Sequence, residues 1–291
     1  MSASPQSLYG IIGYPVTYSL SPIIHNTAFE ALGLDAEYQL FPLKEEELKD
    51  FFSRLKQKDC PIRGLNVTIR YKETVLAFLD SLSPYIQKTM AVNTIVITPQ
   101  RKLTGFNTDG PGFLADLTKH GFKTRNKRVS ILGSGGAVRA ILSVLCLVPE
   151  RPASIKIFNR HKERADKLLG DLKGRFDTGN IETVASIDDL DIRHADLLIN
   201  ATPLGMSTQD ECLVDEGLLH KKLFVYDLIY TVPETKLMKL AKKKGARAVN
   251  GLGMLFYQGV LAFHHWMGEE LNETIKSRIW KKLILAVEKN G

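Results

Sequence analysis

Apolar and polar positions form two kinds of pattern along this chain: short runs rich in β-branched residues, and longer stretches with helical periodicity. Short apolar runs bounded by glycine, proline or polar residues are typical of strands, and apolar positions recurring every three or four residues are typical of helices. In the first half the pattern predicts strands at residues 8–13, 36–43, 62–69 and 91–98, with a return strand after Arg101. It predicts helices over residues 21–32, 45–55, 72–79 and 112–120.

The second half alternates strands with helices or loops. Strands are predicted at residues 129–132, 154–158, 182–185, 197–200, 223–227 and 247–249. Helices are predicted over residues 137–147, 251–267 and 273–289. Strands interleaved with helices favour a doubly wound parallel sheet, and 291 residues suit two domains. We therefore predict a two-domain α/β protein that contains a Rossmann-like nucleotide-binding domain.

A glycine-rich turn joins the strand at 129–132 to the helix that follows it. The turn reads Gly133, Ser134, Gly135, Gly136 and Ala137. Glycine lets the backbone approach a diphosphate with no Cβ in the way, and a helix N-terminus points free N–H groups at it. The spacing differs from G-x-G-x-x-G, so taken alone the turn fits an ordinary strand-to-helix connection equally well.

Composition and charge narrow the function classes. Hydrophobic content of 44% and charged content of 24% are typical of a soluble globular protein, and no apolar run approaches the roughly 20 residues that span a bilayer. The first seven residues lack the features of a secretory signal. Three scattered cysteines show no metal-ligand spacing and fit a reduced cytoplasm, so we expect no metal.

A net charge of +7 suggests nucleic-acid binding at first sight. The basic residues are spread out, however, and the lysines at 242–244 lie at the polar end of an amphipathic helix, as on a solvated face. We therefore expect neither a nucleic-acid nor a membrane partner. A mildly positive field also suits an anionic substrate and a phosphorylated cofactor.

Several polar residues in the first half have both a structural and a chemical interpretation. Ser21 before Pro22 is a typical helix N-cap, but Ser19 and Ser21 could also hold a carboxylate. Lys72 follows a strand, where open α/β sheets bind ligands, although most lysines lie on the surface. Asp109 follows Asn-Thr, either in a helix cap or as a carboxylate at the crossing between domains.

The residues that follow the strand predicted at 154–158 indicate whether the cofactor is NAD or NADP. NAD-binding folds usually place an acidic residue about 20 positions beyond the glycine turn, on the ribose 2′-hydroxyl. Here Asn159 stands at that place and is followed by Arg160 and Arg164. A carboxylate would repel a 2′-phosphate, whereas guanidinium groups bind one. The alternative, a basic first turn of a solvated helix, is weakened because first turns normally favour acids.

Blocks of sequence in a characteristic order resemble the shikimate dehydrogenase family. They are Gly13-Tyr-Pro with Ser19-Leu-Ser21-Pro-Ile-Ile-His25-Asn26, Gly64-Leu-Asn66-Val-Thr68, Ala91-Val-Asn93-Thr94, Gly105-Phe-Asn107-Thr-Asp109-Gly110, Asn200-Ala-Thr202 with Gly205-Met206, and Asp227 to Tyr230. The resemblance covers nearly the whole chain. It implies a substrate-binding domain of residues 1–106 plus 252–291, to which the last two helices return, and an NADP-binding Rossmann domain of residues 107–251, with the active site between them.

The resemblance also implies a role for each matching residue. Lys72 and Asp109 match the catalytic pair: the ammonium stabilises alkoxide charge when hydride reduces a ring ketone, and the carboxylate orients it. The implied substrate-binding residues are Ser19, Ser21, Thr68, Asn93, Asp109, Tyr230 and Gln258. The implied NADP-binding residues are Gly133, Ser134, Gly135, Gly136, Ala137, Asn159, Arg160, Arg164, Thr202, Leu228 and Gly251.

The expected function is reversible NADPH-dependent reduction of 3-dehydroshikimate to shikimate, a step of chorismate and aromatic amino-acid biosynthesis. We expect a cytoplasmic monomer or homodimer. The nearest alternative is a quinate/shikimate dehydrogenase with broader substrate or NAD use. Two others are a binding or scaffold protein that keeps the fold without turnover, and a folate dehydrogenase of similar shape.

One position departs from the family pattern. The family usually has proline two residues before the lysine that Lys72 matches, and this chain has Arg70 there. The substitution frees the backbone φ angle and restores an N–H. A second cation nearby is expected to favour the neutral form of the Lys72 amine, unless Arg70 points to solvent.

Overall fold

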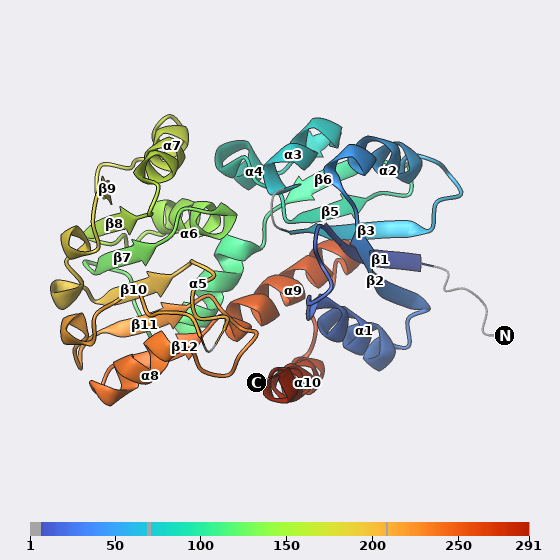
Figure 1. Ribbon diagram of the computed structural model, residues 1–291. Helices are drawn as coiled ribbons and strands as arrows, with labels where there is room; N and C mark the ends of the chain where they lie inside the picture. The colour runs from blue at the N-terminus through green and yellow to red at the C-terminus, as the bar shows by residue number, and fades with distance from the viewer. Residues whose placement is uncertain (1–6, 69–70, 208, 291) are drawn as a thin grey trace. The chain divides into compact units, whose positions relative to one another are not determined.

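The computed structural model describes residues 7–68, 71–207 and 209–290. The chain divides into two compact units (Figure 1). Unit 1 runs to Gly112 and resumes over Leu255–Ala286, and unit 2 covers Phe113–Met254 and the residues after Ala286. The roles expected for residues 1–106 with 252–291 and for residues 107–251 remain predictions.

Unit 1 is built on a mixed six-stranded sheet with the order β2-β1-β3-β5-β6-β4. Its strands are β1 Ser7–Gly13, β2 Ala36–Pro42, β3 Ile62–Val67, β4 Ser81–Leu82, β5 Thr94–Ile97 and β6 Leu103–Phe106. Strand β1 pairs in parallel with β2 and β3, and β5 pairs antiparallel with β3 and β6. Its helical elements are α1 Ser21–Leu32, η1 Glu45–Glu47, α2 Leu48–Leu55, α3 Tyr71–Thr74, η2 Val75–Phe78, α4 Pro84–Thr89, most of α9 Leu252–Met267, and α10 Glu273–Asn290.

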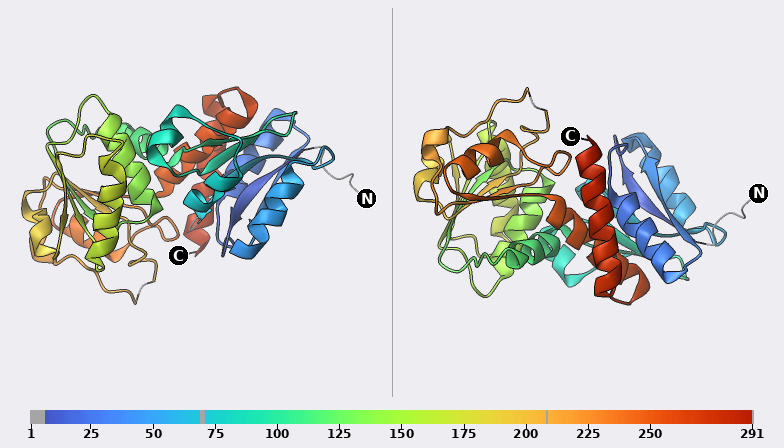
Figure 2. Two further views of the ribbon diagram at one scale, coloured as in Figure 1. Left: turned by 90° about the horizontal axis from the view of Figure 1, so that it is seen from above. Right: turned by 90° about the horizontal axis from the view of Figure 1, so that it is seen from below.

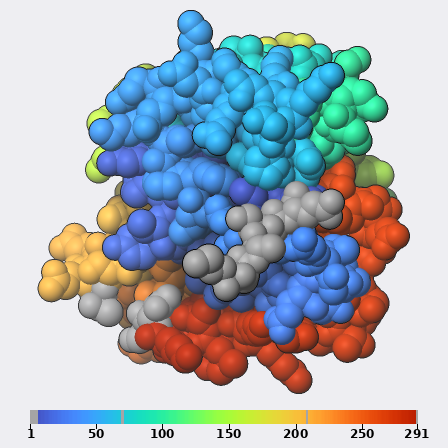
Figure 3. Space-filling model, turned by 90° about the vertical axis from the view of Figure 1, so that its right-hand side faces the viewer, coloured from blue at the N-terminus to red at the C-terminus, as the bar shows by residue number. Residues whose placement is uncertain are grey.

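Both faces of this sheet are covered. Apolar residues of α2, α3, η2 and α4 join the inner residues of β3 and β5 in one cluster. On the other side α9 approaches the sheet closely, because any Cβ at Gly64 would clash with the Trp266 ring. Figure 2 shows α10 (red) beside α1 (blue), where Arg278 and Lys282 reach Glu30. On the face of unit 1 in Figure 3, blue residues from the first part of the chain lie above the red C-terminal helix.

Arg101 ties the turn between β5 and β6 to the end of α2. Its φ is +64°, and its buried guanidinium donates to the carbonyl oxygens of Leu55, Cys60 and Ile62. Removing the guanidinium takes this donor from the Leu55 and Ile62 carbonyls, whereas the Cys60 carbonyl still accepts from Arg63, and each buried acceptor left unsatisfied costs about 1–3 kcal/mol. We expect Arg101→Ala to lower the free energy of unfolding by about 2–4 kcal/mol, measured by urea denaturation. Its control is Lys102→Ala, at an exposed neighbour; equal midpoints for both variants would contradict the proposed tie.

Unit 2 contains a parallel six-stranded sheet with the order β12-β11-β10-β7-β8-β9. The strands are β7 Arg128–Leu132, β8 Ser154–Phe158, β9 Ile181–Val184, β10 Leu197–Asn200, β11 Phe224–Asp227 and β12 Arg247–Asn250. Counted within the unit, this is the 3-2-1-4-5-6 order of a dinucleotide-binding fold. The predicted α/β class with a doubly wound sheet is confirmed.

Alternate residues of the unit 2 strands face two different layers. Val129, Ile131 and Ile199 belong to a cluster with α5 Asp109–Lys119, α6 Gly136–Leu147 and α7 Lys162–Lys173. Leu198 and Val225 face the opposite cluster, with η3 Asp188–Leu190, η4 Ile192–His194 and α8 Lys236–Lys243; η5 Glu216–Leu218 contributes Leu218 at its edge. None of the helices in the described ranges is long and apolar enough to cross a bilayer.

The element boundaries differ from prediction in a few places. The helices predicted from Lys72 and Gly112 begin at Tyr71 and Asp109, and the strand predicted over 91–98 is confined to Thr94–Ile97. Helix α4 was not predicted, although its start has the ordinary signal. Ser83 accepts a hydrogen bond from the Ile86 N–H at 3.4 Å, with proline next in the chain.

Candidate active site

Lys72 and Asp109 form a close ion pair in unit 1. Lys72 lies on α3, just beyond the carboxyl end of β3, and Asp109 is the first residue of α5. The Lys72 Nζ lies 2.5 Å from Asp109 Oδ2, and the two side chains are 17% and 10% exposed. The Lys72 carbonyl accepts the Val92 N–H at 2.7 Å, which fixes the backbone. Both predicted catalytic residues are therefore together, shielded from bulk water but still accessible.

Asn93 holds the other oxygen of the carboxylate. Its Nδ2 donates to Asp109 Oδ1 at 2.8 Å and to Thr108 Oγ1 at 2.9 Å. Its Oδ1 accepts the Thr108 N–H at 2.8 Å, which orients the amide. One carboxylate oxygen thus faces an ammonium and the other an amide N–H. Such a buried, oriented arrangement keeps the lysine nitrogen at a defined place.

Gln258 and Asn107 complete this cluster. Gln258 on α9 donates to the Leu255 carbonyl at 2.8 Å, and its Oε1 lies 3.5 Å from Asn93 Nδ2. Asn107 accepts the Asp109 N–H at 2.9 Å and donates to the Ala91 carbonyl at 2.9 Å. Asn107 was not predicted as a site residue. Its position two residues before a helical aspartate was the available signal, because asparagine commonly bonds a backbone N–H two residues on.

The predicted capping role of Ser21 is wrong. The N-cap of α1 is Leu20, without a side-chain capping bond, and Ser21 is already helical. Instead Ser19 Oγ accepts the Ser21 N–H at 3.3 Å. Neither hydroxyl therefore caps the helix, and the Ser19 hydroxyl hydrogen is left available to donate to a ligand, as carboxylate binding requires.

A hydrogen-bonded chain behind Ser21 leads to Asn93. Burial raises the pKa of Tyr38 well above its ordinary value, and a side-chain hydrogen bond with Ser21 opposes this. The Tyr38 hydroxyl donates to Asn66 Oδ1 at 2.7 Å, and Asn66 Nδ2 donates to the Asn93 carbonyl at 3.1 Å. Sequence reasoning assigned no role to Tyr38 or Asn66. The bonds from Tyr38 to Asn66 and from Asn66 to Asn93 span 28 and 27 positions of the chain, so no local pattern could reveal these contacts.

Thr68 stands apart from these contacts. It directly follows β3, and its N–H donates to the Ile12 carbonyl at 3.0 Å. Its methyl group fills the space where a Cβ at Gly13 would lie, 2.6 Å away. Arg70, the departure from the family pattern, falls outside the described residues, so its expected effect on Lys72 remains a hypothesis.

His25 makes the folded state sensitive to acid. Its ring is fully buried between Tyr38 and Trp266, with centroid distances of 4.5 and 4.8 Å. Burial lowers its pKa from 6.5 to about 3, against a smaller raising effect of Asn66. Because the native pKa is lower than the unfolded one, the unfolded chain takes up the proton first as pH falls.

We expect this histidine to reduce stability by about 1.4 kcal/mol per pH unit between pH 6.5 and about 3. His25→Phe keeps an aromatic ring but removes the titration, so its unfolding free energy should fall less steeply over that range. The measurement is chemical denaturation at a series of pH values, with exposed His194→Gln as the control. Parallel profiles for wild type and His25→Phe would contradict the assignment.

In unit 2 the glycine turn has the geometry of an anion site. Gly133 has φ +104°, and a Cβ there would lie 2.9 Å from the Ala201 carbonyl oxygen. Gly135 is the N-cap of α6 without a side-chain capping bond, and a Cβ there would meet no protein atom within 4 Å. No protein contact thus requires glycine at Gly135. Its missing side chain leaves space before uncapped N–H groups, which fits a diphosphate.

The residues after β8, which are predicted to bind the ribose 2′-phosphate, also suit an anion. Asn159 Nδ2 donates to Ser134 Oγ at 2.7 Å, so the end of β8 is tied to the turn. Arg160 and Arg164 are exposed and make no ion pair with any residue that the structure describes. Lys162 between them is neutralised by Asp166, 2.8 Å away. Two guanidinium groups are therefore available to a phosphate.

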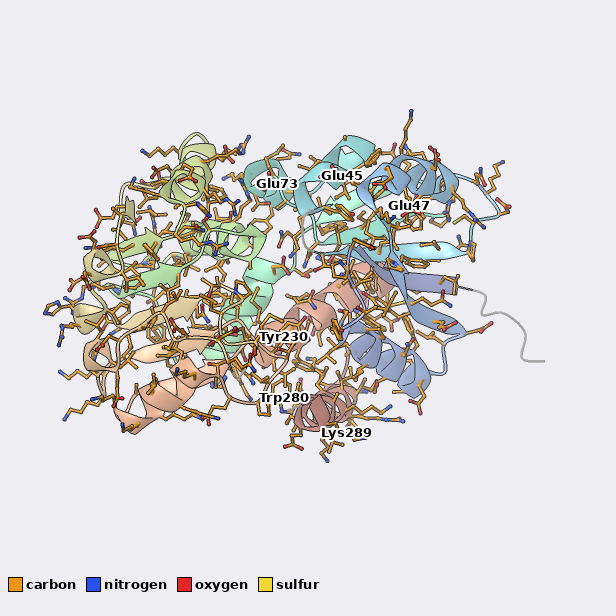
Figure 4. All side chains as sticks on the ribbon, in the orientation of Figure 1. Glu45, Glu47, Glu73, Tyr230, Trp280 and Lys289 are labelled. Atoms are coloured by element: carbon orange, nitrogen blue, oxygen red, sulfur yellow. The ribbon has the colours of Figure 1, made fainter. Side chains whose placement is uncertain are left out.

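The remaining predicted residues of unit 2 follow the carboxyl ends of β10, β11 and β12. Thr202 Oγ1 donates to Asn200 Oδ1 at 2.7 Å, and its methyl group approaches Gly133. Gly251 packs against the Leu228 carbonyl too closely for any Cβ. Tyr230, labelled in Figure 4, is half-buried on the segment after β11. All therefore lie at the sheet edge where doubly wound folds bind ligands.

Asp227 supports this edge and was not predicted. Asn200 Nδ2 donates to its Oδ1 at 3.0 Å and Thr235 Oγ1 to its Oδ2 at 2.7 Å. Burial raises the pKa of this carboxyl. Asp227 thereby joins the loops after β10 and β11. No group of three or more His, Cys, Asp or Glu residues with metal-binding geometry occurs within the described ranges.

Comparison with known proteins identifies relatives over almost the full length. Residues 11–95 match the family profile described as the shikimate dehydrogenase substrate binding domain. The chain is 37% identical over 281 residues to the shikimate dehydrogenase (NADP(+)) of Alkaliphilus metalliredigens, covering 94% of this chain and 96% of the relative.

Two solved structures are similar as well. Shikimate 5-dehydrogenase from Thermus thermophilus, in complex with NADP(H) and shikimate, is 33% identical with a TM-score of 0.81, covering 95% of this chain and 99% of that one. Quinate dehydrogenase from Corynebacterium glutamicum, in complex with NAD, is 28% identical with a TM-score of 0.86, covering 96% and 99%. With 37% identity over nearly its whole length to a curated relative, this chain belongs to the shikimate dehydrogenase family.

Proposed function

We propose that this protein catalyses the reversible reduction of 3-dehydroshikimate to shikimate with NADPH, using Lys72 and Asp109 as its catalytic pair. The observation that carries the proposal is the 2.5 Å contact between these side chains, with Asn93 on the other carboxylate oxygen. A lysine with no role beyond the protein surface would not require a carboxylate that is itself held by a buried amide. Relatives named shikimate dehydrogenase (NADP(+)) support the choice of substrate and cofactor.

Bound NADPH supplies the hydride. The Lys72 Nζ holds the proton that the ring oxygen receives as negative charge develops there, and its positive charge stabilises that oxygen. Asp109 Oδ2 orients the ammonium, since the two atoms are in contact. In the oxidation direction Lys72, as the neutral amine, accepts the proton of the substrate hydroxyl. A scaffold role without turnover is disfavoured because both members of the pair are present and in contact.

We assign the orientation of the substrate to polar side chains from both the first and the second half of the sequence. We assign the substrate carboxylate to the hydroxyls of Ser19 and Ser21, which the helix start does not consume. The ring hydroxyls are assigned to Thr68, Asn93, Asp109, Tyr230 and Gln258, as the family resemblance implies. Residues 1–106 with 252–291 would then be the substrate-binding domain.

The NADP site is assigned to residues 107–251. The Gly133–Ala137 turn would hold the diphosphate, and Arg160 and Arg164 with Asn159 the 2′-phosphate. Thr202, Leu228 and Gly251 would border the nicotinamide half of the cofactor. We further propose a cytoplasmic enzyme that acts as a monomer or homodimer.

A substrate-by-cofactor matrix tests the activity. Shikimate or quinate is combined with NADP or NAD, and reduced nicotinamide is followed by absorbance. We expect the highest kcat/KM for shikimate with NADP, because no carboxylate stands at Asn159 to bind a free ribose hydroxyl. The second candidate is a quinate/shikimate dehydrogenase, favoured by the similarity to a quinate dehydrogenase. The largest kcat/KM for quinate with NAD would establish that candidate instead.

A further inference from the structure

A second cationic site lies in unit 2, at the amino ends of the strands rather than at their carboxyl ends. It is a hollow of about 390 Å³, called here the basic hollow. Its lining residues are Gly121, Phe122, Lys123, Lys127, Lys221, Lys222, Leu223, Phe224 and Arg247. They come from four separate segments, which follow α5 and precede or begin β7, β11 and β12 (Figure 1). The proposed activity uses none of them.

The positive charges of the basic hollow are poorly compensated. Lys127 pairs with Asp196 at 3.1 Å. Within the ranges that the structure describes, Lys123, Lys221 and Lys222 have no carboxylate partner and are exposed. Elsewhere in the same unit the neighbouring lysines of α8 are paired: Lys242 with Glu234 at 2.7 Å and Lys243 with Glu216 at 3.0 Å. The exposed lysines of the hollow thus differ from these lysines of α8, whose charges are neutralised by carboxylates.

Arg247 is held in place in the hollow. Its guanidinium carbon lies 4.9 Å from the centre of the Phe224 ring, and one amino group donates to the His120 carbonyl at the end of α5. A cation–π contact and a carbonyl bond leave its positive charge without a carboxylate. Its remaining N–H donors stay available to an acceptor, in the planar geometry that suits phosphate oxygens.

We propose that the basic hollow binds a small anion with two phosphoryl groups. Four cations, Lys123, Lys221, Lys222 and Arg247, lack a carboxylate partner among the described residues, and each phosphoryl group carries about −1.5 to −2 at neutral pH. A diphosphate of about −3 to −4 therefore matches the uncompensated charge, whereas a single carboxylate does not. Its binding would relieve the mutual repulsion of cations gathered around one concave surface.

A nucleic acid fits the hollow less well. Proteins bind single strands with a groove that follows the backbone and with exposed aromatic rings on which bases stack. Here Phe224 is 3% exposed and packs against Phe122 at 5.3 Å, so its ring is no stacking platform. The cations surround one hollow instead of extending as a stripe.

Calorimetric titration with inorganic pyrophosphate tests the proposal. The full-length protein is saturated with NADP beforehand, so that the carboxyl edge of the sheet is occupied. The test variant is Lys221→Ala/Lys222→Ala, and its matched control is Lys242→Ala/Lys243→Ala, which removes the same charge from paired lysines of the same unit. We expect the test variant to weaken pyrophosphate binding at least about tenfold and the control to stay near wild type. Both variants should keep wild-type melting temperatures and turnover.

Three results would overturn the proposal. The first is an absence of pyrophosphate binding to the wild type at millimolar concentration. The second is an equal loss of affinity in both double variants, which would mean that only net charge attracts the anion. The third is tighter binding of a short oligonucleotide than of pyrophosphate, which would assign the hollow to nucleic acid.

Discussion

Lys72→Ala should lower kcat for shikimate oxidation by about 10³-fold and leave shikimate affinity nearly unchanged. The substitution removes both the proton carrier and the charge that stabilises the ring oxygen; each effect alone contributes about 10²–10³-fold, and the two do not multiply because one ammonium provides both. Shikimate affinity should survive because the proposed carboxylate and hydroxyl ligands remain. Steady-state kinetics with NADP gives kcat, and the quenching of tryptophan fluorescence by shikimate gives the Kd.

Lys56→Ala is the matched control for this prediction. Lys56 is also paired with a carboxylate of unit 1, Asp80 at 2.8 Å, but its side chain is 48% exposed. Such a surface pair contributes little, so turnover and stability should stay near wild type. If Lys72→Ala retained more than about a tenth of wild-type kcat, Lys72 would be a positioning residue at most. A parallel loss of shikimate affinity would instead point to a collapsed site.

Arg160→Ala/Arg164→Ala should raise the KM for NADP by about 10–100-fold and change the KM for NAD little. Each guanidinium is unpaired among the described residues and exposed, so its value lies in charge-assisted bonds to the 2′-phosphate, partly screened by solvent. NAD has no such phosphate. The ratio of kcat/KM for the two cofactors, measured at fixed ionic strength, reports the effect.

Lys162→Ala separates phosphate recognition from general attraction. It removes a positive charge between the two arginines, but this charge is already neutralised by Asp166. The NADP:NAD ratio should therefore stay within about twofold of wild type. An equal loss in Lys162→Ala, or an unchanged ratio in the arginine variant, would show that these arginines do not discriminate the cofactors.

The sequence predicted features that depend on local periodicity. Every strand of unit 2 was placed within one or two residues, since buried parallel strands are short apolar runs between helices. The prediction that Ser21 caps helix α1 was wrong because a serine before proline is compatible with two helix starts one residue apart. Only the position of Leu20 distinguishes them, and no sequence pattern encodes it.

The contacts of the site depend on long-range geometry. The residue types of Lys72, Asp109 and Asn93 were available from family resemblance, but their mutual hydrogen bonds join residues up to 37 positions apart. Asn66 and Asp227 stand in sequence blocks that gave them no role, and Tyr38 stands in none, because the role of a buried polar side chain is recognised only from the partner that satisfies it. Their roles could be read only from coordinates.

The orientation of one amide has a consequence for the chemical ageing of this protein. Asn93 donates to Asp109 with its nitrogen and accepts from Thr108 with its oxygen, so its two ends are not interchangeable. Hydrolysis of that amide would put a second carboxylate against Asp109, in competition for the same ammonium. Because both side chains are buried, the two carboxylates would also repel each other, so this one change of functional group would lower both turnover and stability.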